Sequence, residues 1–186
     1  MKKILSLVVC MLICLSVHAD EHLKFMGIPL NGTITQFQAK LAKKGVTHDV
    51  AGSKMLPPGC RGFNGTFSGK KANIYVYFDT VSKVVYRAKA VIESTEGSIS
   101  SGNYDYFVRM LSEKYYDAEK TEGKQEGYDA ITFLVPNPPD AFYKFYGRIN
   151  VYRSTSDSYP VYYFLHVDYI DTLNSVKHEN RNMEDL

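Results

Sequence analysis

The strongest constraint on the fold is an alternation of apolar and polar residues in the second half of the chain. Residues 142–153 read FYKFYGRINVYR, with an apolar or small residue at every second position from Phe145 to Val151. A period of two is typical of a β-strand with one buried face. The opposite face carries an aromatic and cationic row, which consists of Lys144, Tyr146, Arg148, Asn150 and Tyr152. Such a row either packs against another part of the protein or binds a ligand.

The same alternation predicts further strands. They lie near residues 61–69, 73–79, 84–93, 130–135 and 161–169. Their connections are short in places, and short connections require antiparallel neighbours. The sequence therefore predicts a curved antiparallel sheet of about six strands. Its apolar face must be buried by a second layer.

Two amphipathic helices can supply that layer. Residues 33–36, Thr-Ile-Thr-Gln, have the form of a capping box and start a helix over residues 34–44 that Gly45 ends. A second helical period begins after Asn103, a capping residue, and ends near Tyr116. The predicted fold class is α+β, with both helices packed on one face of the sheet.

Three polar segments lack either period. The stretch at 94–102, STEGSISSG, is predicted to be a turn and linker, and 119–127, EKTEGKQEG, a mobile loop. The C-terminal tail, residues 174–186, is predicted to fray, with a short terminal helix as the alternative.

The two parts of the chain share one order of elements, a helix followed by three strands. The predicted halves are residues 25–93 and 103–170, within a single domain that spans 20–186. Ile74-x-Val76-Tyr77 in the first half is echoed by Ile149-x-Val151-Tyr152 in the second. This order indicates an internal duplication; the alternative is a single-repeat α+β sandwich in which the likeness is accidental.

The N-terminus resembles a secretory signal peptide. Basic residues after Met1 precede an apolar run over residues 4–17, and cleavage is expected after Ala19. We therefore expect a secreted or periplasmic protein without a membrane span, since a span needs about 20 apolar residues. Lipid attachment at Cys10 or Cys14 is the alternative.

The charge of the mature chain argues against nucleic-acid partners. Loss of Lys2 and Lys3 takes the formal charge from +2 to zero, and nucleic-acid binding relies on a surplus of cations. The expected mature chain retains one cysteine, Cys60, so that no intramolecular disulfide can form. Cys60 is either a thiol activated by Arg61 or an inert, half-buried thiol.

The chain loosely resembles a group of small secreted bacterial proteins without an assigned function. The resemblance rests on residues 25–33, FMGIPLNGT, on the helix with Phe37 and Leu41 that ends in Lys44-Gly45, and on the tyrosine-rich strands. The order of elements is also similar to that of β-lactamase inhibitor proteins and small outer-membrane assembly lipoproteins. Those inhibitors carry disulfides that this chain cannot make, and no inhibitory residue can be transferred. The resemblance implies a non-catalytic binding scaffold.

Catalytic motifs do not emerge from the sequence. It has no Gly-x-Ser-x-Gly, phosphate loop or His-Glu-x-x-His pattern. His166 and Asp168 share one strand face, where they are an acid–base pair, two metal ligands or an ordinary surface pair. We expect no enzyme, no cofactor and no metal; a hydrolase with an unrecognised site is the remote alternative.

One face of the predicted sheet gathers aromatic and cationic residues. Its candidate binding residues are Tyr75, Tyr77, Arg87, Lys89, Tyr146, Arg148, Tyr152, Tyr162 and His166. Tyrosine and arginine suit protein recognition, while aromatic rings flanked by polar groups suit a glycan or another small molecule. The sequence therefore predicts a binding module for a protein partner, a second copy or a glycan; an ordinary half-exposed sheet surface is the alternative.

Overall fold

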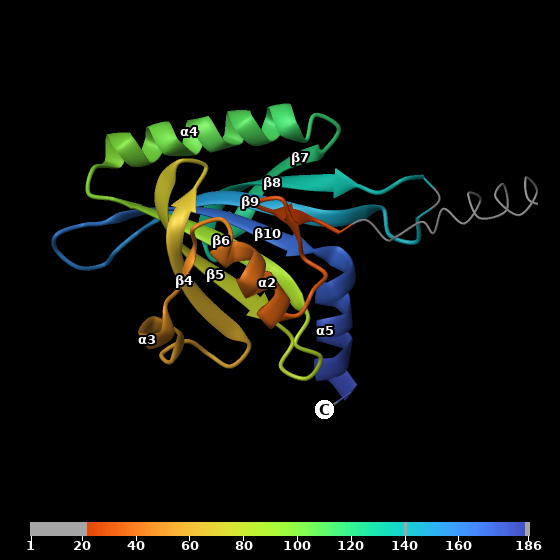
Figure 1. The fold of residues 1–186 in the computed structure, drawn as a ribbon. Helices are drawn as coiled ribbons and strands as arrows, with labels where there is room; N and C mark the ends of the chain where they lie inside the picture. The colour runs from red at the N-terminus through yellow and green to blue at the C-terminus, as the bar shows by residue number, and fades with distance from the viewer. Residues whose placement is uncertain (1–21, 140, 185–186) are drawn as a thin grey trace, which may run out of the picture.

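The computed structural model describes residues 22–139 and 141–184, and within them the chain forms one eight-stranded antiparallel sheet and a separate two-stranded hairpin (Figure 1). Together with the helices, this arrangement confirms the α+β fold and the antiparallel sheet. The predicted signal peptide, residues 1–19, lies outside the described residues.

The elements of the first half run from the hairpin to the middle of the large sheet. They are β1 (Lys24–Phe25), β2 (Ile28–Pro29), α2 (Ile34–Ala42), β3 (Thr47–His48), α3 (Val50–Ser53), β4 (Cys60–Phe67), β5 (Lys70–Phe78) and β6 (Val85–Ser94). The elements of the second half are α4 (Gly97–Lys114), β7 (Glu119–Gln125), β8 (Tyr128–Pro136), β9 (Phe145–Thr155), β10 (Tyr163–Asp171) and α5 (Thr172–Glu184).

The two halves meet in the centre of the large sheet. Its strand order is β3-β4-β5-β6-β10-β9-β8-β7, so that the last strand of each half pairs with the other. In each half a helix precedes the strands that join the large sheet, as expected, but four such strands follow it instead of the predicted three. Whether this order reflects a duplication stays a prediction.

One hydrophobic core joins both long predicted helices to a single face of the sheet. Helix α2 contributes Phe37 and Leu41, and α4, which crosses the sheet in Figure 1, contributes Phe107 and Leu111. The Phe67 ring of β4 stacks on that of Phe107, with 5.5 Å between ring centroids. The predicted capping box also forms, because Thr33 Oγ1 accepts from the backbone of Gln36 and the Gln36 side chain accepts from that of Thr33. The helix layer thus follows the sequence pattern closely.

Helix α4 starts earlier than predicted. It begins at Gly97 inside the supposed linker, and Asn103 lies on its buried face instead of capping it. A Cβ at Gly97 would lie 3.2 Å from the ring of Tyr163, so the small residues of this stretch let the helix approach the sheet closely. Close packing, which a turn-like composition does not reveal, explains the error.

Two further polar segments also form regular structure. The supposed mobile loop is β7, which pairs along its whole length with β8. The C-terminal tail is α5, tied down by contacts from distant residues: Asn174 Nδ2 donates to the Leu30 carbonyl, and the His178 ring stacks on Tyr86. Backbone pairing and tertiary contacts, rather than an apolar periodicity, order both segments.

Gly147, near the start of β9, lies where the sheet packs tightly on the N-terminal segment at Leu23. A Cβ at Gly147 would lie 2.9 Å from the Leu23 side chain and 3.1 Å from the Ile170 carbonyl. We expect Gly147→Ala to lower the free energy of unfolding by about 1–3 kcal/mol, because overpacking forces neighbours to shift. Gly123→Ala, in β7, is the control, since nothing lies within 4 Å of its Cβ position. Equal stabilities of the two variants in urea unfolding would contradict this packing.

Candidate functional site

The candidate binding residues of the central strands do share the sheet face opposite the core. Register places Tyr77 beside Arg87, Tyr75 beside Lys89, and Lys89 beside Asp168. On the other side of β10, Tyr152 lies opposite His166. Ala88 and Ala90 alternate with the two cations and are buried in the core. The phase predicted for this part of the sheet is therefore correct.

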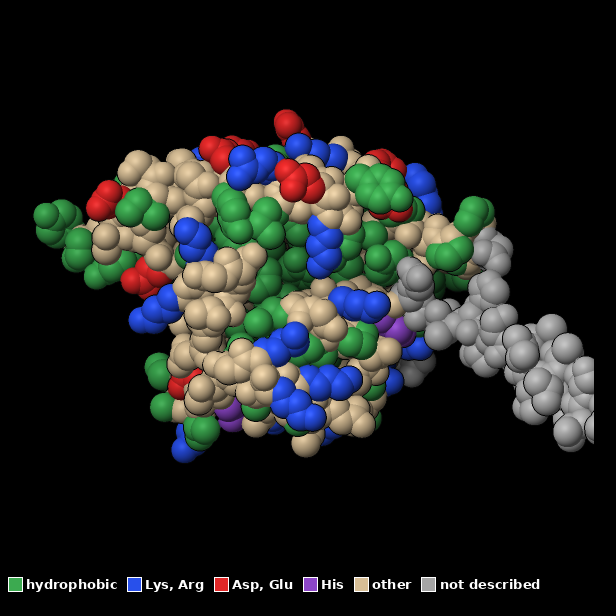
Figure 2. All heavy atoms as spheres, turned by 45° about the horizontal axis from the view of Figure 1, so that its top comes forward, with side chains coloured by type: hydrophobic (Ala, Val, Ile, Leu, Met, Phe, Trp, Pro, Cys, Tyr) green, Lys and Arg blue, Asp and Glu red, His purple; other side chains and the backbone are tan. Residues whose placement is uncertain are grey.

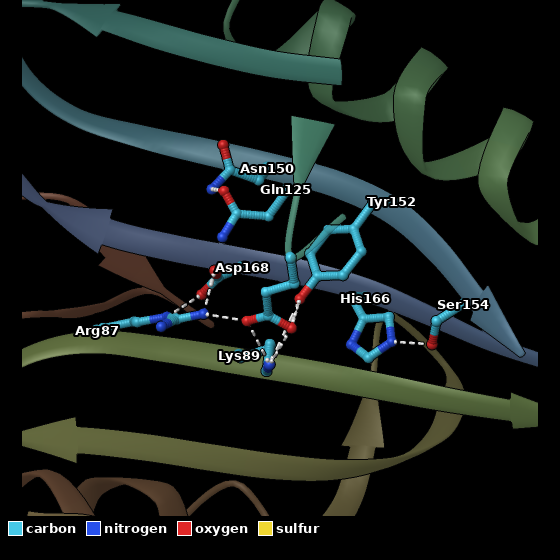
Figure 3. A network of polar contacts seen from close by, with 9 residues as sticks. Arg87, Lys89, Gln125, Asn150, Tyr152, Ser154, His166 and Asp168 are labelled. Carbon is cyan, nitrogen blue, oxygen red and sulfur yellow. Dashed lines mark hydrogen bonds and ion pairs between the residues drawn. The ribbon is translucent and has the colours of Figure 1, made fainter. Parts of the chain in front are cut away.

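An ion pair lies at the centre of this face. Arg87 Nε and Nη2 donate to the two carboxylate oxygens of Asp168, each at 2.8 Å (Figure 3). Burial raises the pKa of the Asp168 carboxyl, and the hydrogen bonds from Arg87 oppose that rise. Burial alone would lower the pKa of Arg87, but its bonds to Asp168 outweigh burial and hold the pKa above the ordinary value. The bidentate geometry is that of a guanidinium bound to a carboxylate.

A glutamate from the β7–β8 turn covers this pair. Glu126 accepts from Arg87 Nη2 at 3.0 Å, from Lys89 Nζ at 3.2 Å and from the Tyr152 hydroxyl at 2.8 Å. Burial opposes ionisation of Glu126, but these donors outweigh it and lower its pKa to about 2. Glu126 thus joins the β7–β8 turn to donors on β6 and β9. We call Arg87, Lys89, Glu126, Tyr152 and Asp168 the Glu126 network.

The Glu126 network removes two candidate residues from solvent. Tyr152 is 0% exposed and Lys89 is 8% exposed. The Tyr152 ring stacks on His166, with 4.4 Å between centroids, and its other ring neighbour is Tyr128 at 6.5 Å. Tyr152 and Lys89 are therefore not part of an exposed binding face. The covering turn belongs to the segment that the sequence presents as a loop.

Three candidate residues lie away from this cluster. Tyr146 packs against the hydrophobic core beside Tyr115, because the pairing of β8 with β9 shifts register between Val135 and Pro136. Arg148 is exposed farther along β9, opposite Ile170. Tyr162 is half-buried and precedes β10, and its backbone N–H donates to Ser156 Oγ. The nine candidates thus do not form one surface.

His166 and Asp168 do not form an acid–base pair. His166 Nε2 hydrogen-bonds Ser154 Oγ at 2.8 Å, whereas both Asp168 oxygens bind Arg87. Burial, with Lys89 and Arg87 nearby, lowers the pKa of His166 to about 4, so the imidazole is neutral at pH 7. Its Nδ1 atom is buried and has no hydrogen-bond partner within the described part of the chain. No group of three or more potential ligands that could hold a metal ion occurs among residues 22–139 and 141–184.

A hollow of about 360 Å³ opens next to the Glu126 network. Its lining, which we call the sheet hollow, consists of Leu56, Pro57, Cys60, Tyr75, Tyr77, Lys89, Val91, Phe164 and His166. Four of these residues, Tyr75, Tyr77, Lys89 and His166, are candidates from the sequence. Burial raises the pKa of the Cys60 thiol, and a hydrogen bond with Tyr77 only partly offsets that rise. Cys60 is therefore a protonated thiol at neutral pH, not one activated by Arg61.

The sequence missed the residues that complete this site. Glu126 stands in a polar run without periodicity, and only its pairing partner β8 could have indicated a hairpin there. Leu56 and Pro57 lie in the segment that connects α3 to β4. This segment brings both residues to the hollow on the sheet face. Val91 alternates in phase with Arg87 and Lys89, so that the strand pattern did contain its position.

No protein-family model, curated protein or solved structure matches this chain. The resemblance to secreted bacterial proteins and to β-lactamase inhibitor proteins therefore stays a prediction. In the described part of the chain, no helix has the length and apolarity that crossing a bilayer requires. The function must be inferred from the geometry of the site.

The Arg87–Asp168 pair gives a direct test of what holds the site together. We expect Arg87→Met to lower the free energy of unfolding by about 3–5 kcal/mol, because it leaves the buried Asp168 carboxylate without its cation. The double variant Arg87→Met/Asp168→Leu is the control and should recover most of that loss, since no buried charge is left. Denaturant unfolding measures both. A double variant no more stable than Arg87→Met would contradict a charge-based cause.

His166 predicts a pH dependence of stability. Its folded pKa of about 4 lies below the ordinary value of 6.5, so between these values only the unfolded chain takes up the proton. The contribution of neutral His166 to the free energy of unfolding is complete above pH 6.5. It is lost as the pH falls towards 4, by about 2 kcal/mol after allowance for partial exposure. In denaturant unfolding at a series of pH values, His166→Gln should flatten the decline in unfolding free energy between pH 6.5 and 4, while the control Val81→Ala, at an exposed residue without an ionisable group, should leave it unchanged. An unchanged slope in His166→Gln would refute the assignment.

Proposed function

We propose that this chain is an exported, non-catalytic binding module that receives an apolar side chain of a protein partner in the sheet hollow. The observation that carries the proposal is the contrast between this hollow and its surroundings. Its walls are largely aromatic and aliphatic, from Leu56, Tyr75, Val91 and Phe164. The adjoining charges are bound to one another.

Pairing within the Glu126 network argues against a charged ligand. Arg87 and Lys89 are balanced by Glu126 and Asp168, at distances of 2.8–3.2 Å. A ligand anion would have to displace carboxylates that already bind the two cations in a partly dry environment. The cationic residues therefore favour a structural role, and recognition falls to the neighbouring apolar surface.

Exposed apolar residues occur in and after α3, in the segment that leads to Leu56 of the hollow. Met55, next to Leu56 of the hollow, is 89% exposed, and Val50 at the start of α3 is 58% exposed. Methionine and aromatic residues are enriched in protein interfaces, where a central pocket takes an anchor side chain and a rim excludes water. This surface supports a protein partner, which includes a second copy of the chain.

Glycan binding is the second candidate. Tyr75 and Tyr77 supply half-buried rings to the hollow, and His166 also lines it. A sugar ring requires several polar partners at once because its hydroxyl groups lose water on binding. The largely apolar lining favours the side chain of a protein over a sugar.

The proposed absence of catalysis rests on the state of the reactive groups. His166 is occupied by Ser154 at one nitrogen, and Asp168 is bound to Arg87. The thiol of Cys60 is protonated. Export follows from the predicted signal peptide at residues 1–19.

Amide NMR spectra with small probes test the proposal. We expect millimolar N-acetyl-phenylalanine amide to shift the amide signals of Tyr75, Val91 and Phe164, and methyl glucoside or N-acetylglucosamine to leave them in place. Val91→Phe fills the hollow and should abolish the shifts, whereas Val81→Phe, on the exposed β5–β6 turn, should preserve them. Shifts from the sugars alone would favour the glycan candidate, and no shifts from any probe would refute the sheet hollow as a binding site.

A further inference from the structure

A second, larger cavity lies on the other side of the molecule, beneath α4. It has a volume of about 490 Å³ and lies between α4 and β4, with the β1–β2 turn and the end of α2 beside it. We call it the α4 furrow; its lining residues are Met26, Lys44, Phe67, Ser68, Phe107, Met110, Leu111, Lys114 and Tyr169. Figure 2 shows hydrophobic side chains gathered below the helix, with basic side chains around them.

The floor of the furrow is rigid and its sides are adaptable. Phe67, Phe107 and Tyr169 belong to the core, and the first two rings stack on each other. Met26 and Met110 are half-buried on the sides, and methionine is flexible enough to follow the outline of a ligand. A volume of this size is in the range of small-molecule sites. The furrow can therefore take an apolar chain along the aromatic floor.

Three lysines place positive charge at the furrow, and the described residues that line it include no carboxylate. Lys44 and Lys114 line the furrow, and Lys24 is close enough to Lys114 to lower its pKa further, beyond the larger lowering by burial. In the described ranges none of the three makes an ion pair. The Lys114 ammonium lies over the Tyr115 ring, 5.0 Å from its centroid. Clustered cations without counter-charges attract an anion.

We propose that the α4 furrow binds a single-chain amphipathic carboxylate, a free fatty acid, with its chain on the aromatic floor and its head group at Lys44 and Lys114. The combination of an apolar channel and unbalanced lysines carries the inference. Helix C-termini favour lysines through the helix dipole, but that effect explains neither Lys24 on β1 nor the apolar channel between the lysines. The chain's own apolar N-terminal sequence fits the furrow poorly, since Lys2 and Lys3 would add to its positive charge.

Calorimetric titration with short-chain amphiphiles below their micelle concentrations tests this site. The protein is titrated with octanoate, decanoate, decyltrimethylammonium and decyl maltoside. We expect decanoate to bind about fifteenfold more tightly than octanoate, since each buried methylene contributes about a fourfold change in affinity. It should bind more tightly than the cationic and the neutral amphiphile, and it should shift the amide signals of Phe107 and Tyr169.

Charge reversal separates this site from general apolar binding. Lys44→Glu/Lys114→Glu should weaken decanoate binding by about tenfold or more, because two cations are lost. The same double variant should bind decyltrimethylammonium more tightly. The control Lys43→Glu changes an exposed neighbour that does not line the furrow. Met110→Trp, at a half-buried position, should block decanoate without loss of the folded circular-dichroism spectrum.

Several results would overturn the inference. Equal affinities for the three ten-carbon amphiphiles would reduce the site to apolar contact, and decanoate affinity unchanged by the double charge reversal would exclude the lysines. Shifts at His166 in place of Phe107 would move the ligand to the sheet hollow. An acidic amphipathic peptide that binds the furrow where decanoate does not would assign it to a protein partner. Apart from shifts at His166, these outcomes leave the test of the sheet hollow unaffected, because the two cavities share no lining residue.

Discussion

The ion pair between Arg87 and Asp168 is the interaction on which the open face of the sheet depends. It crosses the boundary between β6 and β10, the only strands through which the two halves of the large sheet pair in the described part of the chain. A carboxylate with no exposed surface is tolerated there because two donors from one guanidinium satisfy it. Glu126 then neutralises the second cation, Lys89, and draws the β7–β8 turn over the strands.

This arrangement divides the sheet face into a polar part and an apolar part. Tyr152 belongs to the polar part, since its hydroxyl donates to Glu126, although its ring stacks on His166. His166 lies at the boundary and lines the hollow. Mutual pairing of the charges holds the side chains of the polar part in place, so the hollow beside it is largely preformed. The α4 furrow has the opposite character, with unbalanced charge and flexible methionines around a rigid floor.

The sequence predicted those features that depend on periodicity. Alternation placed Arg87, Lys89, Tyr152 and His166 on the face opposite the core, and helical spacing placed Phe37 and Phe107 on the core side. The prediction failed where a strand irregularity changes which face of the sheet a residue occupies. At Tyr146, next to the register shift between β8 and β9, the ring packs against the core. It also failed for elements ordered by partners distant in the chain. Glu126 is the main example, because its three donors come from residues 87, 89 and 152.

The charged strand β7 has a consequence for the behaviour of the protein at high concentration. An open sheet presents unpaired backbone groups at both edges, and such edges recruit strands from other molecules. Here one edge is β3, with two residues, and the other is β7, whose side chains from Glu119 to Lys124 are all exposed and include two lysines and two glutamates. Behind β7 lies β8, with the sequence YDAITFLVP. The polar segment thus separates an aggregation-prone apolar strand from neighbouring molecules and favours a chain that does not polymerise edge to edge.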